Sequence, residues 1–223
     1  MKKKRIKIRW SKVIVLAVII TFAVLGIYLY TSIPVRTIYV TGNKILSENE
    51  VLKSTNLLSY PKIYTLSETM MEKDLLKNPL IKKAKVTKSL SGKVTISIIE
   101  NKILYQDSAN NIMLSSGKII ENREISGIPT LINEVVDVED KFIDKMTLIK
   151  QDILIHISEI EYKPSDLDKE RFLFYMSDGN YVYITLSKID LINSYNEIYP
   201  TLEGKKGILY LDSGNHFEIK KSD

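Results

Sequence analysis

The feature that most constrains this chain is an uncharged run of eighteen residues, 13–30, close to its N-terminus. As an α-helix this run is about 27 Å long, and its extension to residue 33 gives about 32 Å, the thickness of the hydrocarbon core of a bilayer. Trp10, Tyr28 and Tyr30 lie near its two ends, as aromatic side chains do at membrane interfaces. The sequence therefore predicts a transmembrane helix over residues 13–33.

Charge is unevenly distributed about this helix. Residues 1–12 carry seven of the 32 basic side chains and no acidic one, so the rest of the chain holds 25 basic and 27 acidic side chains. A short basic flank stays in the cytoplasm, so we expect residues 1–12 to be a cytoplasmic tail that contacts anionic lipid, with the C-terminal bulk outside. A nearly neutral outer part argues against a nucleic-acid-binding protein, whose folded surface would be basic.

A cleaved signal peptide is the alternative interpretation of the same run. The apolar stretch is longer than the usual hydrophobic region of about 7 to 15 residues, and residues 28–34 contain no small-x-small cleavage site. These two observations favour a retained membrane anchor.

The residues that follow predict a small β-α-α-β-β module held together without disulfides, because the chain has no cysteine. Its expected elements are a strand at residues 35–40, a helix that starts at Glu48, a helix at about 67–77, and strands around 84–86 and 94–98.

Local signals mark the ends of both helices. Ser47 and Glu50 have the spacing of a capping box for the first helix. Thr65 and Ser67 are alternative N-caps for the second, which ends before Pro79.

The remaining chain reads mostly as β-strand with two helices. Expected strands lie at residues 112–114, 118–120, 157–162, 171–176, 181–186, 208–211 and 216–219, and residues 128–131 are expected to form a short extended link. Apolar stripes at spacings of 4, 3 and 4 predict the helices, one through Phe142, Met146, Ile149 and Ile153 after Asp137 as N-cap, the other through Leu191, Tyr195, Ile198 and Leu202. The strand that comes last is expected at a sheet edge.

Catalytic and metal-binding patterns are weak. The two histidines offer only the pairs His156 with Glu159 and His216 with Glu218, too few ligands for a metal site. The S-x-x-K matches at residues 59–62 and 115–118 contain a proline or fall in an expected hairpin, and no K-T-G or S-D-N accompanies them. We therefore expect no catalytic, cofactor or metal site, no small-molecule substrate and no enzymatic activity.

Several motifs in order resemble the POTRA module of the FtsQ/DivIB cell-division proteins. They are V-x-x-I-x-V-x-G-N at residues 35–43, S-x-N-E at 47–50, NPLIKKAKV at 78–86 and VTISIIE at 94–100. Residues 157–160, 176–182 and 207–214 are similar to the second domain of that family. Two turns depart from the family pattern: Ser91-Gly92 stands where a proline is usual, and Ser116 precedes Gly117 in place of an aspartate.

The resemblance implies an α+β protein with one N-terminal transmembrane helix, a small POTRA domain, and a mostly antiparallel β domain with flanking helices. The expected parts are a basic tail at 1–12, the helix at 13–33, the POTRA domain at 34–102, the β domain at 103–220 and a short tail at 221–223. The protein is expected in the cytoplasmic membrane as a single-pass protein with an N-terminal cytoplasmic tail, extracellular domains and enrichment at the division septum.

The implied function is a non-enzymatic scaffold of the division complex. It would bind FtsL-type and DivIC/FtsB-type proteins and couple the septal peptidoglycan synthase complex to the division ring, by addition of a partner strand to a sheet edge. The residues carried over as partner contacts are Leu211, Ser213, Gly214, Phe217 and Ile219, although each could merely complete the sheet. The POTRA edge strand is a second possible docking place. Alternative functions are a POTRA-containing secretion or chaperone component and a membrane-anchored envelope hydrolase.

Overall fold

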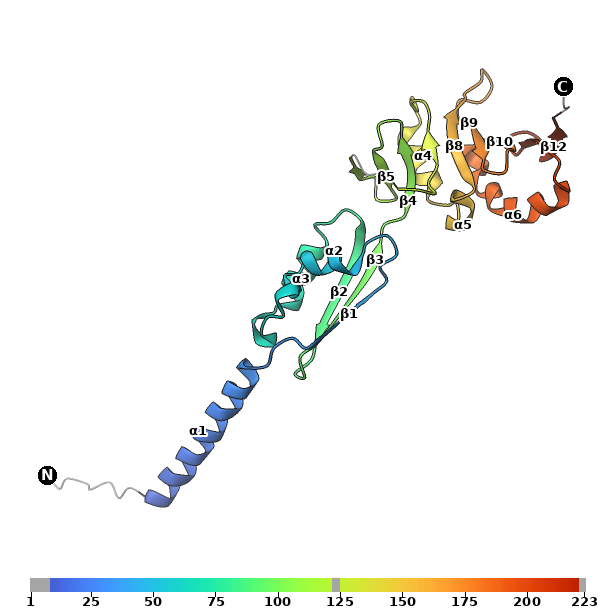
Figure 1. The fold of residues 1–223 in the computed structure, drawn as a ribbon. Helices are drawn as coiled ribbons and strands as arrows, with labels where there is room; N and C mark the ends of the chain where they lie inside the picture. Colours follow the sequence, from blue (N-terminus) through green and yellow to red (C-terminus); the bar gives the residue numbers. More distant parts are fainter. Residues whose placement is uncertain (1–8, 122–124, 221–223) are drawn as a thin grey trace. The chain divides into compact units, whose positions relative to one another are not determined.

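The computed structural model describes residues 9–121 and 125–220 and divides into two compact units, Met1–Glu100 and Asn101–Asp223 (Figure 1). Most of the predicted cytoplasmic tail, residues 1–8, and the predicted tail at 221–223 lie outside the described residues. Each unit is described by itself below.

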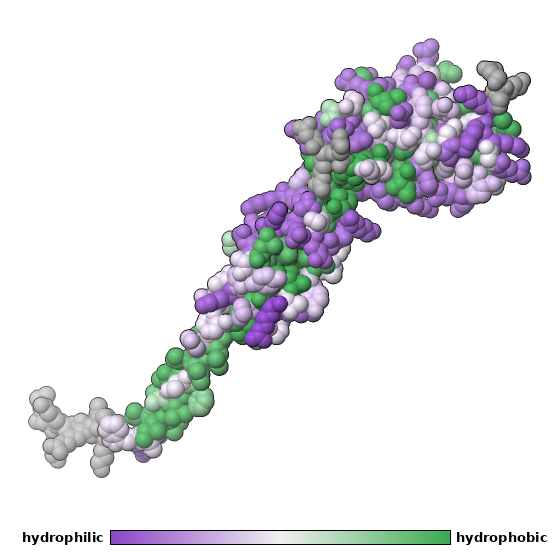
Figure 2. Space-filling view, in the orientation of Figure 1, coloured by the Kyte–Doolittle hydropathy of each residue, from purple (hydrophilic) through white to green (hydrophobic). Residues whose placement is uncertain are grey.

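The first unit begins with a single long helix, α1 (Trp10–Thr31), at the predicted transmembrane segment. Its length and composition suffice to cross a membrane, and Figure 2 shows hydrophobic side chains all along it. The hydroxyl group of Thr21 donates to Ala17 O at 2.9 Å, and that of Ser32 donates to Tyr28 O at 2.8 Å. These polar groups are satisfied within the helix itself, as a hydrocarbon environment requires.

A three-stranded sheet with helices on one side makes up the rest of this unit (Figure 1). Its elements are β1 (Thr37–Thr41), α2 (Glu48–Lys53), the 3₁₀ helices η1 (Leu57–Ser59) and η2 (Ile63–Thr65), α3 (Glu68–Leu75), β2 (Ile81–Lys88) and β3 (Lys93–Glu100). The strand order is β1-β3-β2, with β1 parallel and β2 antiparallel to β3. The predicted β-α-α-β-β order is confirmed, while the two 3₁₀ helices were not predicted.

The helix ends follow the local sequence signals. The Ser47 hydroxyl accepts from Glu50 N at 3.3 Å and the Glu50 carboxylate accepts from Ser47 N at 2.8 Å, which completes the predicted capping box. Ser67 is the N-cap of α3, because its hydroxyl accepts from Met70 N, whereas the Thr65 hydroxyl donates to the carbonyl of Lys62, the residue before η2. Both N-cap positions therefore obey the same rule of satisfying the first free amides of a helix.

The outer edge of β2 is closed by carboxylates of α3. Glu72 accepts from Val86 N at 2.9 Å and Glu68 accepts from Lys88 N at 2.7 Å. Because residues opposite each other in an antiparallel pair alternate between bonded and unbonded, these two amides are the ones that face away from β3. The side chains of α3 thus occupy donors that an added strand would need.

The second unit contains one nine-stranded sheet. Its elements are β4 (Ile103–Asp107), β5 (Ile112–Leu114), β6 (Ile119–Ile120), β7 (Thr130–Leu131), α4 (Glu139–Met146), α5 (Gln151–Leu154), β8 (Ile157–Tyr162), β9 (Arg171–Met176), β10 (Tyr181–Thr185), η3 (Leu186–Ser194), α6 (Tyr195–Ile198), η4 (Tyr199–Leu202), β11 (Gly207–Tyr210) and β12 (His216–Ile219). The strand order is β12-β11-β10-β9-β8-β7-β4-β5-β6. Most neighbouring strands are antiparallel, which confirms the predicted fold class.

The core of this unit lies between one face of the sheet and the helices. Phe142 of α4 stacks on Phe172 of β9 with ring centroids 4.5 Å apart, and both side chains are fully buried. Phe174, Val182 and Leu209 continue the same buried face across β9, β10 and β11. Alternate residues of these strands, such as Tyr181 and Tyr183 of β10, point to the opposite face.

The prediction of one helix through Phe142 and Ile153 with Asp137 as N-cap is wrong. The segment forms α4 and α5 with a break between them, and Asp137 has a positive φ of 69° before the helix begins. The break is stabilised from outside: the Lys102 amine donates to the carbonyls of Thr147 and Ile149.

Asn193 completes this break. Its side chain accepts from Lys150 N at 2.7 Å and donates to Leu148 O at 3.0 Å. The four stripe residues are nevertheless buried, so the stripe identified the core correctly while the helix itself is interrupted.

The last predicted helix is also interrupted. The segment from Leu186 to Leu202 is 3₁₀ helix with a kink at Lys188, apart from one α-helical turn, α6. Its apolar stripe still faces the sheet, with Tyr195 buried and Leu191 and Ile198 half-buried against the core. The two turns that depart from the family pattern, at Ser91-Gly92 and Ser116-Gly117, both form, and Gly92 and Gly117 have positive φ.

We predict that the Val86 amide reports the ionisation of Glu72. The hydrogen bond from Val86 N, opposed by burial and reinforced by Lys85, lowers the pKa of the Glu72 carboxyl below its ordinary value of 4.5. Stability from this contact is therefore present above pH 4.5 and is lost as the pH falls through the lower, folded-state pKa. The Val86 amide proton shift should titrate below pH 4.5 by NMR, and Glu72→Gln should abolish that titration.

Glu68→Gln is the matched control for this titration. It should alter the Lys88 amide and leave the Val86 titration in place, because each carboxylate accepts from a different amide. A Val86 titration that persists in Glu72→Gln would contradict the assignment.

We further predict that Lys102→Met destabilises the second unit by about 1–3 kcal/mol, because it leaves half-buried helix-end carbonyls without their donor. Burial lowers the pKa of the Lys102 amine, so this cation is already partly desolvated. Thermal unfolding of the full chain in detergent measures the effect. Lys118→Met, at an exposed position in a turn, should leave the transition unchanged.

Candidate functional site

The terminal strand β12 forms an edge of the nine-stranded sheet, as predicted from its place in the sequence. It pairs only with β11 among the described strands, and Lys220 N donates to Lys206 O at 2.9 Å just beyond the ladder. Alternation along an antiparallel pair then directs the main-chain groups of Glu218 toward β11 and those of Phe217 and Ile219 away from it. The open edge therefore offers the N–H and C=O groups of Phe217 and Ile219.

A buried asparagine fixes where β11 begins. Asn180, at 1% exposure, accepts from Gly207 N at 2.9 Å and donates to the Tyr195 hydroxyl at 3.2 Å. Tyr195 in turn donates to Asp178 at 2.7 Å. Burial, with the nearby Asp178 carboxylate adding to it, raises the pKa of the Tyr195 hydroxyl, so this group stays a hydrogen-bond donor.

Gly207 allows β12 to approach. A Cβ atom at this position would lie 2.0 Å from Glu218 O and 2.8 Å from the Phe217 ring. The obstruction is main chain, so it cannot be relieved by a side-chain rotation. The position of β12 therefore depends on the absence of a side chain at residue 207.

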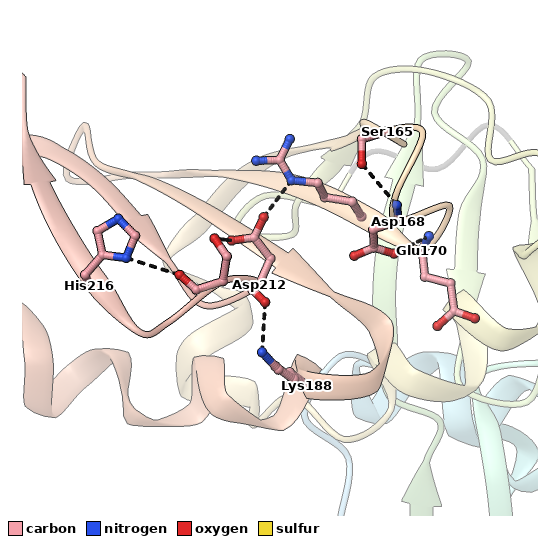
Figure 3. Close-up of polar contacts among 8 residues, drawn as sticks. Ser165, Asp168, Glu170, Lys188, Asp212 and His216 are labelled. Carbon is pink, nitrogen blue, oxygen red and sulfur yellow. Dashed lines mark hydrogen bonds and ion pairs between the residues drawn. The ribbon is translucent and has the colours of Figure 1, made fainter.

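The turn between β11 and β12 is held by charges that come from outside the hairpin. The Arg171 guanidinium donates to the Asp212 carboxylate at 2.6 Å, and the Lys188 amine donates to Asp212 O at 2.8 Å (Figure 3). The side chains of Arg171 and Asp212 are 21% and 9% exposed, so this ion pair is only weakly screened. The exposed tip of the turn follows at Ser213 and Gly214, and Gly214 has a positive φ of 86°.

Beside this edge, aromatic rings line the sheet face opposite the buried core. Tyr183 stacks on Tyr210 with centroids 5.5 Å apart, and Tyr210 stacks on His216 at 4.7 Å. Arg171 lies over the Tyr183 ring at 3.7 Å. Burial, and secondarily Glu218, raises the pKa of the Tyr210 hydroxyl.

A shallow hollow of about 670 Å³ lies on this face. It extends over β9 to β12 and includes Leu173, Tyr181, Ile208, Glu218 and Lys220. An apolar floor with a few charged groups at its margin suits a protein side chain better than a reaction.

The five predicted contact residues divide by position. Ile219 is 53% exposed and Phe217 is half-buried against the core, while Ser213 and Gly214 lie in the exposed turn. Leu211 is 3% exposed, so its side chain packs inside the unit. The structure thus brings the open main-chain groups together at β12.

Sequence reasoning missed the aromatic face beside them. The alternation of Tyr181 and Tyr183 with buried residues is the signal that could have revealed it.

The histidine His156 and the first S-x-x-K match, residues 59–62, do not form a shared site in the structure. His156 is exposed after α5, and Ser59 and Lys62 lie in exposed positions of η1 and the segment that follows it. Within residues 9–121 and 125–220 there is no group of three or more His, Asp or Glu side chains arranged to hold a metal ion.

The Tyr175 hydroxyl and the Glu161 carboxyl are hydrogen-bonded, and each shifts the pKa of the other. The hydrogen bond from the Tyr175 hydroxyl to Glu161, at 2.7 Å, raises the pKa of Tyr175 to about 12. Burial opposes ionisation of Glu161, but the bonds from Tyr175 and Lys163 outweigh it and lower the pKa of that carboxyl. Both groups therefore hold their charge states over the neutral range and serve structure.

Comparison with known proteins finds relatives of this chain. The family of FtsQ-type POTRA domains matches residues 33–101. Cell division protein DivIB of Bacillus subtilis (strain 168) is 30% identical over 206 residues, which cover 86% of this chain and 77% of that protein. Cell division protein DivIB of Listeria monocytogenes is 29% identical over 227 residues, which cover 97% and 84%.

A solved structure of the major extracytoplasmic domain of the trans isomer of DivIB from Geobacillus stearothermophilus is 22% identical, with a TM-score of 0.38. The match covers 47% of this chain and 95% of that one.

The extent of the sequence similarity decides the family. The relative from Bacillus subtilis matches at 30% identity over most of both chains, and the POTRA match falls on the domain that follows α1. The resemblance inferred from the motifs is confirmed, and this chain belongs to the DivIB family of cell-division proteins.

Proposed function

We propose that this protein is a non-enzymatic scaffold of the division complex that binds partner proteins by strand addition at β12. The observation that carries the proposal is the open edge at Phe217 and Ile219, next to an aromatic hollow. An added strand would bond its main chain to these two residues, and its alternate side chains would reach the hollow.

The partners we propose are single-span division proteins of the FtsL and DivIC/FtsB type. Through them the protein would link the septal peptidoglycan synthase complex to the division ring. Such partners are tethered to the same membrane, so binding to a weak edge gains from a high effective concentration.

The β12 edge suits this role better than the edge of β2. At β2 the amides of Val86 and Lys88 already donate to Glu72 and Glu68. At β12 the outward groups belong to Phe217 and Ile219, with the exposed Ile219 side chain beside them. Within the described part of the chain, the outward amides of these two residues donate no hydrogen bond.

The membrane arrangement is also part of the proposal. We propose that α1 spans the cytoplasmic membrane once, with the basic residues 1–12 in the cytoplasm, and that residues 34–102 and 103–220 are two domains outside. The short basic flank supports this orientation. Enrichment at the division septum follows from the proposed partners.

We predict that Ile219→Pro weakens binding of the full chain to its DivIC-type partner at least about tenfold, because proline removes an outward donor and its ring obstructs the added strand. The outward N–H does not bond to β11, so proline here leaves the β11–β12 ladder intact. Ile219→Ala is the matched control, since it removes the same side chain and keeps the donor. Titration calorimetry in nanodiscs measures the affinities.

Equal affinities for Ile219→Pro and Ile219→Ala, with unchanged thermal unfolding, would contradict strand addition at β12. Gly207→Ala tests the same edge indirectly, because the new methyl group clashes with Glu218 O and so displaces β12. It should weaken binding without touching the binding surface.

A fluorescent fusion of the full chain should concentrate at midcell, and depletion should give filaments without septa. Division that proceeds normally while secretion fails would instead favour the chaperone alternative. Time-lapse microscopy of the depleted strain distinguishes the two outcomes.

A further inference from the structure

Three segments of the POTRA domain are bonded together directly after α1. Ile63 N donates to Ile33 O at 2.9 Å, Val35 N donates to Pro61 O at 2.9 Å, and Arg36 N donates to Gly92 O at 2.8 Å. The Lys88 amine also donates to the carbonyls of η2 and the residue after it. Residues 33–36, 57–66 and 88–93 thus form one end of the domain, called here the tether end.

The covalent chain keeps the tether end close to α1. The helix ends at Thr31, and Ile33 is already hydrogen-bonded to η2. Two residues span at most about 7 Å, which is comparable to the depth of one headgroup layer of a bilayer. Insertion of α1 therefore brings the tether end to the membrane surface, whichever compartment the domain occupies.

The tether end carries the side chains that membrane interfaces favour. Its large exposed side chains are Leu58 at 49%, Tyr60 at 55%, Tyr64 at 44% and Leu90 at 71% exposure. Its basic residues are Arg36, Lys62, Lys88 and Lys93, and no Asp or Glu occurs in the three segments. Amphipathic aromatic rings and basic side chains together favour an anionic headgroup layer.

The backbone holds one of these rings outward in an uncommon conformation. Tyr60 has φ 47° and ψ 57°, the left-handed region that bulky residues rarely adopt. Its side chain is nevertheless more than half exposed, so packing within the domain does not account for an aromatic residue there. Such outliers persist where a function requires them.

We propose that the tether end is a second membrane-contacting surface, in which Leu58, Tyr60, Tyr64 and Leu90 enter the headgroup layer and Arg36 and Lys62 bind the phosphates of anionic lipids. The occupant is a bilayer surface because the tether leaves no room for a protein partner of comparable size between this end and the membrane. The inference rests on insertion of α1, as proposed above, and not on partner binding at β12.

The absence of cysteine makes the test direct, because each introduced cysteine is the only one. The full chain is reconstituted into phosphatidylcholine vesicles with or without phosphatidylglycerol. A nitrobenzoxadiazole label is placed at Ser91→Cys in the tether end, at Thr21→Cys inside α1, or at Lys44→Cys beyond the far end of β1. Quenching by lipids that carry a doxyl group near the headgroup reports contact of position 91 or 44 with the membrane surface, and lipids that carry it deep in the acyl chain report insertion of position 21.

We expect the label at position 91 to be quenched with phosphatidylglycerol present and the label at position 44 to stay unquenched. Lys62→Gln should lower the ratio of docked to undocked domain about fivefold. Lys44→Gln, with the same change in charge, should not. Tyr64→Ser with Leu90→Ser should reduce quenching at position 91, whereas Ile99→Ser, at an equally exposed site on β3, should leave it unchanged.

Two results would overturn the inference. An unquenched label at position 91, with position 21 quenched, shows an inserted helix and an undocked domain. Quenching at position 91 that is the same with and without phosphatidylglycerol, and the same in Lys62→Gln, shows that the surface does not recognise anionic lipid. An unquenched label at position 21 would instead contradict the membrane insertion on which the proposed function depends.

Discussion

The hydrogen bond from Gly207 N to the buried side chain of Asn180 is the interaction on which the terminal sheet edge depends. Asn180 also bonds to Tyr195, so one side chain ties the β9–β10 turn, helix α6 and the start of β11 together. This anchor fixes the start of β11 beside β10, and β12 pairs with β11 in turn. A buried amide with all its partners satisfied specifies position strongly, because any shift would leave a polar group unpaired.

The edge strands β2 and β12 differ in whether their outward main-chain groups are hydrogen-bonded. On β2 the outward amides are bonded to Glu68 and Glu72, which protects the strand from unplanned pairing. On β12 the turn is held tightly through Asp212, while the outward main chain of Phe217 and Ile219 faces away from the sheet. This difference between the two edges supports the proposed strand addition at β12.

Much of the fold could be predicted because its signals are local. The capping box at Ser47 and the apolar stripe through Phe142 depend on residues within one or two helical turns. The break between α4 and α5 could not be predicted, since Lys102 and Asn193 create it from more than 40 residues away.

The same distinction applies to the candidate site. A last strand is easily placed at an edge, but the stack of Tyr183 on Tyr210 arises only from the parallel pairing of β10 with β11. Pairings between distant segments depend on the completed fold, so one sequence does not reveal them.

The bond between Ile33 and Ile63 also has a mechanical consequence. Because the domain is fastened at the second residue after the end of α1, almost no slack chain separates them. A pull on the POTRA domain by a bound protein is thus transmitted to the membrane anchor at once, without first straightening a flexible linker. Under the proposed membrane arrangement, any force on the domain would reach the bilayer through this short connection.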